Sequence, residues 1–407
     1  MVSPHAFPPG DDVGHAVAAE AEALARRGHA VTILAPGTGR PAAEAGRRRI
    51  EALEAGDRDA VAADAGSPPL VVATSRAIRS GAKGPGRRLG GPIDSASGLE
   101  IALGLGGFDV AHLHEPLAPS PALAALRHAT GVRAVTFHRT APLAGVAFVR
   151  PLVDRALAQA DLRIALSAAA GHVLAGILPG AYEVVPEGID PALFGPPSTA
   201  PGVVVVARDR DRTGLRFVMR ALAATDPALS GPITVIGPAG TPQRTRAAVP
   251  KALRERVSVM PDAGATARGE AFRRGRIALF PTAEEAATPV LREASGPEVE
   301  EALGGDSGIA LPPFTSEAWA DAITSCLVNP ARVALLSAAA EQRGRARTWD
   351  DVAADLETLY RGVAARPAEA AANGTEAPVF ADLRVRGGSG LGPREIVQAA
   401  VDRDVRI

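Results

Sequence analysis

Residues 107–140 read GFDVAHLHEPLAPSPALAALRHATGVRAVTFHRT. A short apolar run at 108–114 is followed by a stretch with helical spacing at 120–131 and by a second apolar run at 132–138. Short, continuous apolar strands that alternate with helices are typical of a parallel sheet whose two faces are both covered. These residues therefore predict a β–α–β unit and an α/β fold.

The same alternation extends in both directions along the chain. Residues 11–28 have apolar positions at helical spacing and end at Gly28, a suitable C-cap, before the strand-like residues 29–37. Farther on, a helix is expected at 148–160 and a strand at 162–167.

The intervening residues 37–97 are rich in Gly, Pro, Ala and Arg. Such a composition predicts irregular structure, and only residues 69–74, PLVVAT, are typical of a strand.

The alternation restarts after the Pro- and Gly-rich residues 191–202, which we predict to be a domain boundary. Further strands are expected at 203–207, 232–237, 256–260 and 276–280, and helices at 316–328, 330–346 and 349–365. We predict the following organisation: a Rossmann-like domain at 1–192, a second at 200–363, a linker at 364–380 and a separate tail at 381–407. Two such domains in tandem place a ligand crevice at the carboxyl ends of their strands.

The composition of the 407 residues excludes several classes of protein. The hydrophobic fraction is 46%, the charged fraction is 22% and the net charge is −1, so no overall field attracts nucleic acid or an anionic membrane. No apolar run approaches the ~18 residues of a membrane span, and the N-terminus lacks a signal-peptide pattern. The single cysteine, Cys326, cannot form an internal disulfide, which predicts a cytoplasmic protein with at most peripheral membrane contact.

The chain resembles the retaining GT-B glycosyltransferases of family 4, especially their phosphatidylinositol mannosyltransferase branch. Matching stretches occur in the family's order over about residues 3–363: RRGHAVTILAPG, GFDVAHLHEPLAPS, ALRHATGVRAVTFHRT, YEVVPEGIDPALF, EEAATPVLREA and TWDDVAADLETLY. The resemblance implies two Rossmann-like domains that face each other across a cleft. It also implies transfer of a hexose from a nucleotide-diphosphate sugar on the C-terminal domain to a hydroxyl acceptor, possibly lipid-linked, on the N-terminal domain. No cofactor and no obligatory metal are expected.

Glu285 and Glu293 match the family's E-x7-E pair, which implies contacts with hydroxyl groups of the donor sugar and ribose. Thr288 is a good N-cap and Pro289 a good first helical residue, so the pair brackets a helix start. Pro289 also removes a backbone N–H near the expected diphosphate. The alternative is that both glutamates are ordinary solvated side chains.

Two further groups of the predicted donor site follow from the resemblance. His138, just beyond a predicted strand, matches a histidine whose imidazole or backbone approaches the transferring sugar. His114 and Glu115 also follow a strand; we interpret them mainly as supports, with a direct ligand contact left open.

Arg208 and Arg212 occupy the stretch where the family binds the leaving diphosphate, to which guanidinium groups can bind in a bidentate manner. The family's lysine at this site is replaced by Thr213, and Asp209 and Asp211 are interleaved with the arginines. A solvated charged turn is therefore the alternative interpretation.

Several features depart from the family pattern. Asp11-Asp12 stands where a Gly-Gly pair lets the backbone approach the donor; in a slipped alignment Gly10 and Gly14 would supply the flexibility. Met1-Val2 replaces most of the first strand, which predicts a short sheet edge there. Pro186-Glu187-Gly188 replaces a Pro-Asn-Gly turn, and the chain is shortened after Glu293. The alternative function is thus a catalytically impaired GT-B homologue that acts as a scaffold, regulator or binding protein.

Residues 381–407 resemble the opening of a PHP phosphoesterase domain. The metal-binding histidines of that family are replaced by Arg384 and Arg386, which cannot coordinate a cation as a neutral imidazole does. A vestigial domain start or an unrelated strand and helix are the two interpretations of this tail.

Overall fold

The structure is a computed structural model, and it describes residues 1–9, 12–79, 88–90, 92–118, 122–138, 146–190, 202–207, 213–237, 242–261, 265–280, 306–309, 311 and 315–372. Contacts within the chain define two compact units, Met1–Glu357 and Thr358–Ile407. Because this division does not separate residues 1–192 from 200–363, the domain boundary near residues 191–202 remains a prediction.

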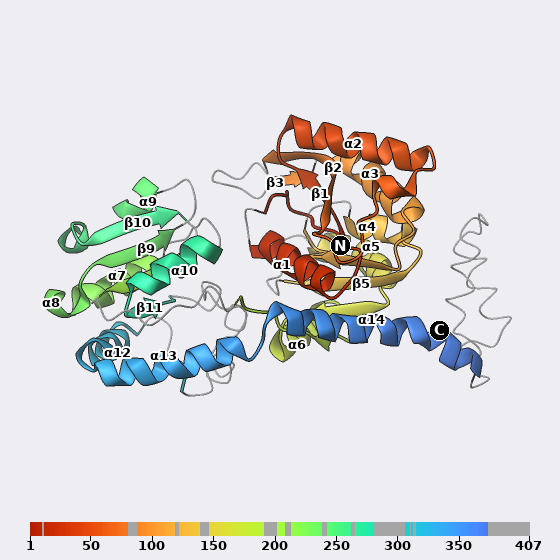
Figure 1. Cartoon of the computed structure of the whole chain (residues 1–407). Helices are drawn as coiled ribbons and strands as arrows, with labels where there is room; N and C mark the ends of the chain where they lie inside the picture. Colours follow the sequence, from red (N-terminus) through yellow and green to blue (C-terminus); the bar gives the residue numbers. More distant parts are fainter. Residues whose placement is uncertain are drawn as a thin grey trace. The chain divides into compact units, whose positions relative to one another are not determined.

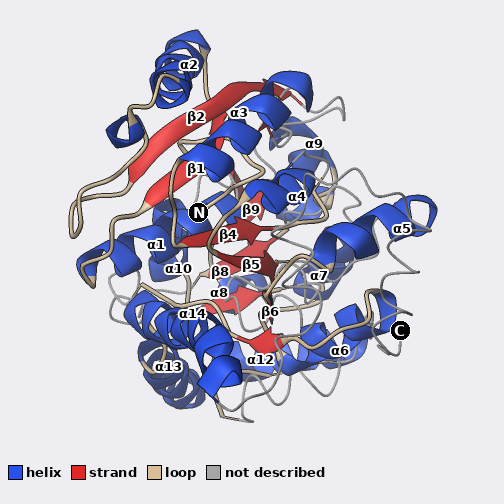
Figure 2. Ribbon diagram, turned by 90° about the vertical axis from the view of Figure 1, so that its right-hand side faces the viewer, coloured by secondary structure: helices blue, strands red, loops and turns tan. Residues whose placement is uncertain are grey.

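The first body of the larger unit contains two sheets (Figure 1). One has the strand order β1-β2-β3, with β1 parallel to β2 and β3 antiparallel; the other is entirely parallel with the order β4-β5-β6-β7. The strands are β1 (Thr32–Gly37), β2 (Leu70–Arg79), β3 (Arg88–Gly90), β4 (Val110–His114), β5 (Val132–Phe137), β6 (Leu162–Ala165) and β7 (Glu183–Val184). Figure 2 shows β4, β5 and β6 side by side.

Val2 joins these two sheets. It forms parallel bridges to Leu34 of β1 and to Leu113 of β4. Its N–H donates to the His112 carbonyl at 2.7 Å, and its own carbonyl accepts from the His114 N–H at 3.0 Å. The prediction of a short sheet edge at Met1-Val2 is therefore wrong, because Val2 lies between β1 and β4 and not at an edge. Buried backbone groups need partners, and the strands on both sides of Val2 supply them.

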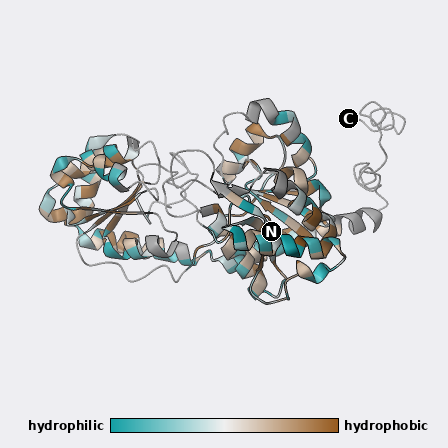
Figure 3. Ribbon diagram, turned by 90° about the horizontal axis from the view of Figure 1, so that it is seen from above, coloured by the Kyte–Doolittle hydropathy of each residue, from teal (hydrophilic) through white to brown (hydrophobic). Residues whose placement is uncertain are grey.

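Helices cover these strands. They are α1 (Asp12–Arg26), α2 (Arg40–Glu54), α3 (Pro92–Leu105), α4 (Ala122–Ala125), α5 (Val146–Leu157) and α6 (Ala168–Ile177). One apolar core includes Leu34, Leu53 and Phe137, and a second lies along α1 and includes Val17 and Ala21. In Figure 3 hydrophobic and hydrophilic residues are interspersed along the helices, as expected where they occupy opposite faces.

Within residues 37–97, the structure describes 37–79, 88–90 and 92–97, and for these the prediction of irregular structure is wrong. Helix α2 buries Gly46, Ile50 and Leu53, which recur at intervals of four and three residues and so share one helical face. Gly46 allows close packing, because an added Cβ would lie 1.9 Å from the Ala73 carbonyl oxygen of β2. The many arginines on the other face of α2 conceal this pattern in the sequence.

The second body contains a parallel sheet with the order β10-β9-β8-β11. Its strands are β8 (Val203–Val206), β9 (Ile233–Gly237), β10 (Val257–Pro261) and β11 (Ile277–Leu279), which confirms the four predicted strands. The helices are α7 (Thr213–Ala223), α8 (Pro227–Ser230), α9 (Pro242–Ala247), α10 (Ala265–Arg274), α12 (Ser316–Val328) and α13 (Pro330–Arg345). Phe217 of α7 meets Trp319 of α12 edge to face, with ring centroids 5.5 Å apart. The predicted α/β class with parallel sheets is thus confirmed.

Helix α14 (Trp349–Ala372) returns the chain to the first body. Its buried Ala353 belongs to the core along α1, and Trp349 packs against the same core. The helix continues to Ala372, so residues 364–372 of the predicted linker are helical, consistent with the high helix propensity of their alanines. The tail predicted at 381–407 lies outside the described residues.

Among the described residues, no single helix combines the length and apolarity needed to cross a membrane. Only Ser316–Val328 and Pro330–Gln342 taken together meet that criterion, and this pair is bent by 98°.

Three side chains fasten α14 to the end of α1. The Glu357 carboxylate accepts from Arg27 Nε and Nη2 at 2.8 and 3.0 Å, and it lies 2.7 Å from His29 Nε2. Its side chain is only 7% exposed. The Arg27 hydrogen bonds outweigh the effect of burial and, with the His29 contact, lower the pKa of Glu357 to about 2.

We predict that Glu357→Gln lowers the melting temperature by a few degrees Celsius, because the amide offers Arg27 and His29 a neutral acceptor. The pKa of Glu357 is lower in the folded protein than its usual 4.5, so its stabilisation is complete above about pH 5 and is lost as the pH falls from 4.5 towards 2. The melting temperatures of wild type and variant should therefore converge over that acid range in thermal denaturation.

Glu341→Gln is the matched control. Glu341 pairs with Arg345 on an exposed face of α13, with side chains 40% and 58% exposed, and such pairs contribute little. An equal loss of stability in the two variants, or a difference that does not depend on pH, would contradict this account.

Candidate functional site

One of the six predicted donor-site residues lies within the described part of the chain. That residue is His138; Gly10, Arg208, Arg212, Glu285 and Glu293 lie outside it. The roles proposed for those five therefore remain predictions from the sequence.

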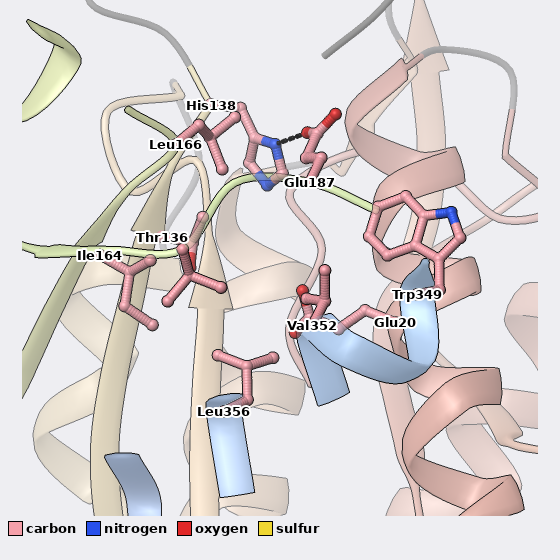
Figure 4. A pocket seen from close by; sticks show the side chains of 10 residues that line it. Glu20, Thr136, His138, Ile164, Leu166, Glu187, Trp349, Val352 and Leu356 are labelled. Carbon is pink, nitrogen blue, oxygen red and sulfur yellow. Dashed lines mark hydrogen bonds and ion pairs between the residues drawn. The ribbon is translucent and has the colours of Figure 1, made fainter. Parts of the chain in front are cut away.

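His138 directly follows β5 and is 2% exposed. Its Nδ1 lies 2.8 Å from Glu187 Oε1 and its Nε2 lies 3.0 Å from His114 Nδ1. Figure 4 shows the imidazole directed towards the Glu187 carboxylate. Because both ring nitrogens already have protein partners, the imidazole has no free polar atom for a sugar hydroxyl in this conformation.

The register of the parallel sheet creates this arrangement. His112 and His114 are two residues apart on β4, and their backbone partners on β5 are Ala134 and Thr136. Alternate residues of a strand point to the same face. Both histidines of β4 therefore share one face, and Thr136 of the neighbouring strand lies beside them on it.

Helix α1 contributes a buried carboxylate to the same cluster. Glu20 Oε1 lies 3.1 Å from His112 Nδ1 and 3.6 Å from His114 Nε2. His112 Nε2 in turn lies 2.7 Å from the Thr136 hydroxyl. The rings of His112 and His114 are in contact, with centroids 4.2 Å apart. The three side chains are at most 7% exposed, so the cluster is shielded from solvent.

Glu187 is held in place by the start of α14. Arg347 Nε donates to the Pro186 carbonyl at 2.9 Å, and the Ile189 N–H donates to the Arg347 carbonyl at 3.0 Å. Gly188 packs closely here, because an added Cβ would lie 2.5 Å from the Trp349 backbone nitrogen. The turn that replaces Pro-Asn-Gly is thus a docking point for the returning helix.

The histidines differ in their electrostatic environment. Burial alone would lower the pKa of His138, but the hydrogen bond and charge of Glu187, with two further carboxylates nearby, raise it above the usual value. Burial, followed by the neighbouring His112 and His138, lowers the pKa of His114 well below its usual value. The Glu187–His138 contact therefore favours an ion pair, whereas His114 is neutral.

A small cavity adjoins this cluster (Figure 4). Its volume of about 10 Å³ holds about one water molecule, so it cannot accept a sugar nucleotide. Its walls are formed by Glu20, Thr136, His138, Ile164, Leu166, Val185, Glu187, Trp349, Val352 and Leu356. The side-chain cluster therefore supports the end of β5 from within.

Sequence reasoning did not identify Glu20, His112 and Glu187 as parts of this cluster. The His-x-His spacing at 112–114 was a usable signal, because it places both rings on one face of a strand. Glu20 and Glu187 gave no comparable signal, since each reaches the histidines only through the packing of distant segments. His114, interpreted as a support, is fully buried within the network.

Solved glycosyltransferases share this fold. A glycosyltransferase from Rickettsia africae ESF-5 matches with a TM-score of 0.53 at 13% identity, covering 89% of this chain and 97% of that one. WaaG, a glycosyltransferase of lipopolysaccharide biosynthesis, matches with a TM-score of 0.58 at 14% identity over 89% and 100%. Anabaena HepE, solved with UDP, matches with 0.57 at 15% identity over 88% and 98%. The fold is that of the GT-B glycosyltransferases, as predicted.

The sequence comparisons point to the same family. Residues 13–193 match the model of Glycosyltransferase Family 4. The phosphatidyl-myo-inositol mannosyltransferase of Mycobacterium leprae is 26% identical over 389 residues, which are 89% of this chain and 96% of that protein. The corresponding protein of Propionibacterium freudenreichii is 29% identical over 174 residues, 42% of this chain and 41% of its own length. The predicted resemblance to family 4 is thus confirmed, and the family model matches residues 13–193.

We predict that Gly188→Ala destabilises the protein by about 1–3 kcal/mol, the usual cost of overpacking. The added Cβ would meet backbone atoms of Thr348 and Trp349 within 2.5–2.7 Å, and backbone cannot rotate away as a side chain can. Urea denaturation measures the difference.

Gly176→Ala is the control, because nothing lies within 4 Å of a Cβ at this position in α6, and alanine favours a helix over glycine. If Gly188→Ala is as stable as Gly176→Ala, the close contact between the turn and α14 is absent.

Proposed function

We propose that this protein transfers a hexose from a nucleotide-diphosphate sugar to a hydroxyl acceptor with retention of configuration. The observation that carries the proposal is the similarity to a phosphatidyl-myo-inositol mannosyltransferase over 96% of that protein's length, on a GT-B fold. The UDP bound in the structure of Anabaena HepE supports a nucleotide donor. The mannosyltransferase relatives support a lipid-linked acceptor of the inositol type, reached by peripheral contact with a membrane.

The residue roles follow from the chemistry of the reaction. Departure of a nucleoside diphosphate leaves negative charge, which Arg208 and Arg212 would stabilise through bidentate hydrogen bonds. Glu285 and Glu293 would accept hydrogen bonds from donor hydroxyls. Gly10 would let the first loop approach the diphosphate.

His138 would meet the transferring sugar through its backbone. Its two ring nitrogens are occupied by Glu187 and His114, whereas its backbone ends β5, next to the loop that follows. In this proposal the buried network is a scaffold that sets the position of the strand end.

We further propose that transfer requires neither an organic cofactor nor a catalytic metal, and that the protein works in the cytoplasm. The proposed chemistry needs only cationic side chains and hydroxyl-binding carboxylates at the donor. The single cysteine fits a reducing compartment.

The second candidate function is binding without turnover, as a scaffold or regulator. Asp11 and Asp12 add negative charge where the family approaches the donor with glycine, and each like charge within ~4–6 Å costs on the order of 1–4 kcal/mol at an effective dielectric of 20–80. Both ring nitrogens of His138 contact protein side chains, which also favours binding without turnover.

Calorimetry with UDP- and GDP-sugars separates the two functions. A transferase should show saturable binding and slow donor hydrolysis, and Arg208→Ala should weaken the affinity by about 10- to 100-fold, the loss of one hydrogen bond to a charged group. Arg220→Ala, on the exposed surface of α7, should leave the affinity unchanged.

Absence of heat and of a thermal shift with every sugar nucleotide would exclude the transferase proposal. A stoichiometric protein partner in pull-downs under those conditions would favour the scaffold.

A further inference from the structure

Three ligand atoms converge behind the strand that carries the histidine pair. They are a carboxylate oxygen of Glu20 on α1 and one imidazole nitrogen each of His112 and His114 on β4, and all lie within 4.8 Å of one another. The three side chains are buried. None of them has a part in the donor chemistry proposed above.

One of the two measured distances between these atoms is too long for a hydrogen bond. Glu20 Oε1 lies 3.1 Å from His112 Nδ1, but 3.6 Å from His114 Nε2, which is too far for a hydrogen bond. In a tetrahedral site with bonds of about 2.0–2.1 Å, neighbouring ligand atoms are about 3.3 Å apart. The two observed distances bracket that value.

Two of the polar atoms lack hydrogen-bond partners. Glu20 Oε1 and His114 Nε2 are buried without a hydrogen bond of good geometry within the described structure. A buried polar atom left unsatisfied is costly, and a charged one more so. A cation at the centre of the cluster would satisfy both atoms at once.

The rings are also oriented as those of metal ligands are. The nitrogen of His112 that faces away from Glu20 contacts the Thr136 hydroxyl at 2.7 Å. The corresponding nitrogen of His114 contacts His138 Nε2 at 3.0 Å. Outer partners of this kind fix the tautomer and direction of a ligating imidazole.

The protonation of the ligands also matters, because an imidazole binds a metal through a neutral ring. When His114 directs Nε2 at a cation, Nδ1 carries the ring proton and donates it to His138.

We propose that Glu20, His112 and His114 form a binding site for a divalent transition-metal cation, best matched by Zn²⁺. Two imidazoles and one carboxylate are typical zinc ligands, and three protein ligands leave a fourth position for water. Three protein ligands are more usual in catalytic zinc sites than in structural ones, but the burial of this cluster leaves a substrate no access, so we assign it a structural role: it fastens α1 to β4, across 92 positions of sequence from Glu20 to His112. The proposal is independent of donor binding and adds a metal that the sequence did not predict.

Metal content and stability test the site in the full-length protein without a histidine tag. The protein is unfolded in EDTA and refolded with or without Zn²⁺, because folding gives the metal access to a buried site. We expect about one zinc per chain by elemental analysis after removal of free metal, and a higher melting temperature than for the EDTA sample. Refolding with Co²⁺ should give the visible absorption of a tetrahedral site.

Two substitutions at one position test the assignment. Glu20→Gln preserves the shape but removes the charged ligand, and should weaken zinc binding by about 100-fold or more, since even outer-shell changes cost 10- to 100-fold. Glu20→Leu replaces the carboxylate by an apolar side chain suited to burial, so it should fold and bind no zinc. Glu100→Gln, at a partly exposed contact with Arg127 and His128, should keep full occupancy.

Less than about one-tenth of a zinc per wild-type chain after refolding, with no zinc-dependent melting shift, would overturn the proposal. Equal occupancy in wild type and Glu20→Leu would also overturn it, because the metal would then be bound elsewhere.

Discussion

The rest of the first body depends on one constraint: β4 pairs in parallel with β5, and Val2 joins β4 to β1. In a sheet buried on both faces, backbone groups have only neighbouring strands as partners. Val2 supplies them between β1 and β4. The pairing also sets the register, and a shift by one residue would turn His112 and His114 to the opposite face. The same strand pairing therefore sets both the position of the two histidines and the continuity of the sheet.

The returning helix α14 stabilises the same region from the other side. Arg347, just before the helix, binds the turn that carries Glu187. Farther along, Trp349 and Ala353 pack in the core along α1, and Glu357 binds Arg27 and His29. The turn at Glu187, helix α14 and the end of β5 are thus linked by a continuous series of contacts. Trp349 and Leu356, more than 200 positions from His138 in the sequence, line the cavity beside it.

The buried polar cluster carries a free-energy cost that an apolar core would not have. Two glutamates and three histidines lie below 8% exposure, and each needs a partner of suitable charge or hydrogen-bonding capacity. The Glu187–His138 contact meets this need with an ion pair. The Glu20 side of the cluster meets it incompletely in the described structure, which is the physical reason to expect a cation there. A network of this kind specifies one arrangement of its segments, since alternatives leave charges unpaired.

The sequence by itself determined the α/β class, the parallel strands at 108–114, 132–138 and 203–207, and the resemblance to family 4, because these depend on local apolar patterns and short motifs. It also placed His138 at a strand end. Only the tertiary structure decided that α2 is a helix despite its arginines, that Val2 lies in the middle of the sheet, and that Glu20 and Glu187 reach the histidines. The contacts of Val2, Glu20 and Glu187 join residues tens to hundreds of positions apart and depend on register and packing, which leave no periodic trace in the chain. The apolar spacing of α2 is present in the sequence but is hidden among its arginines.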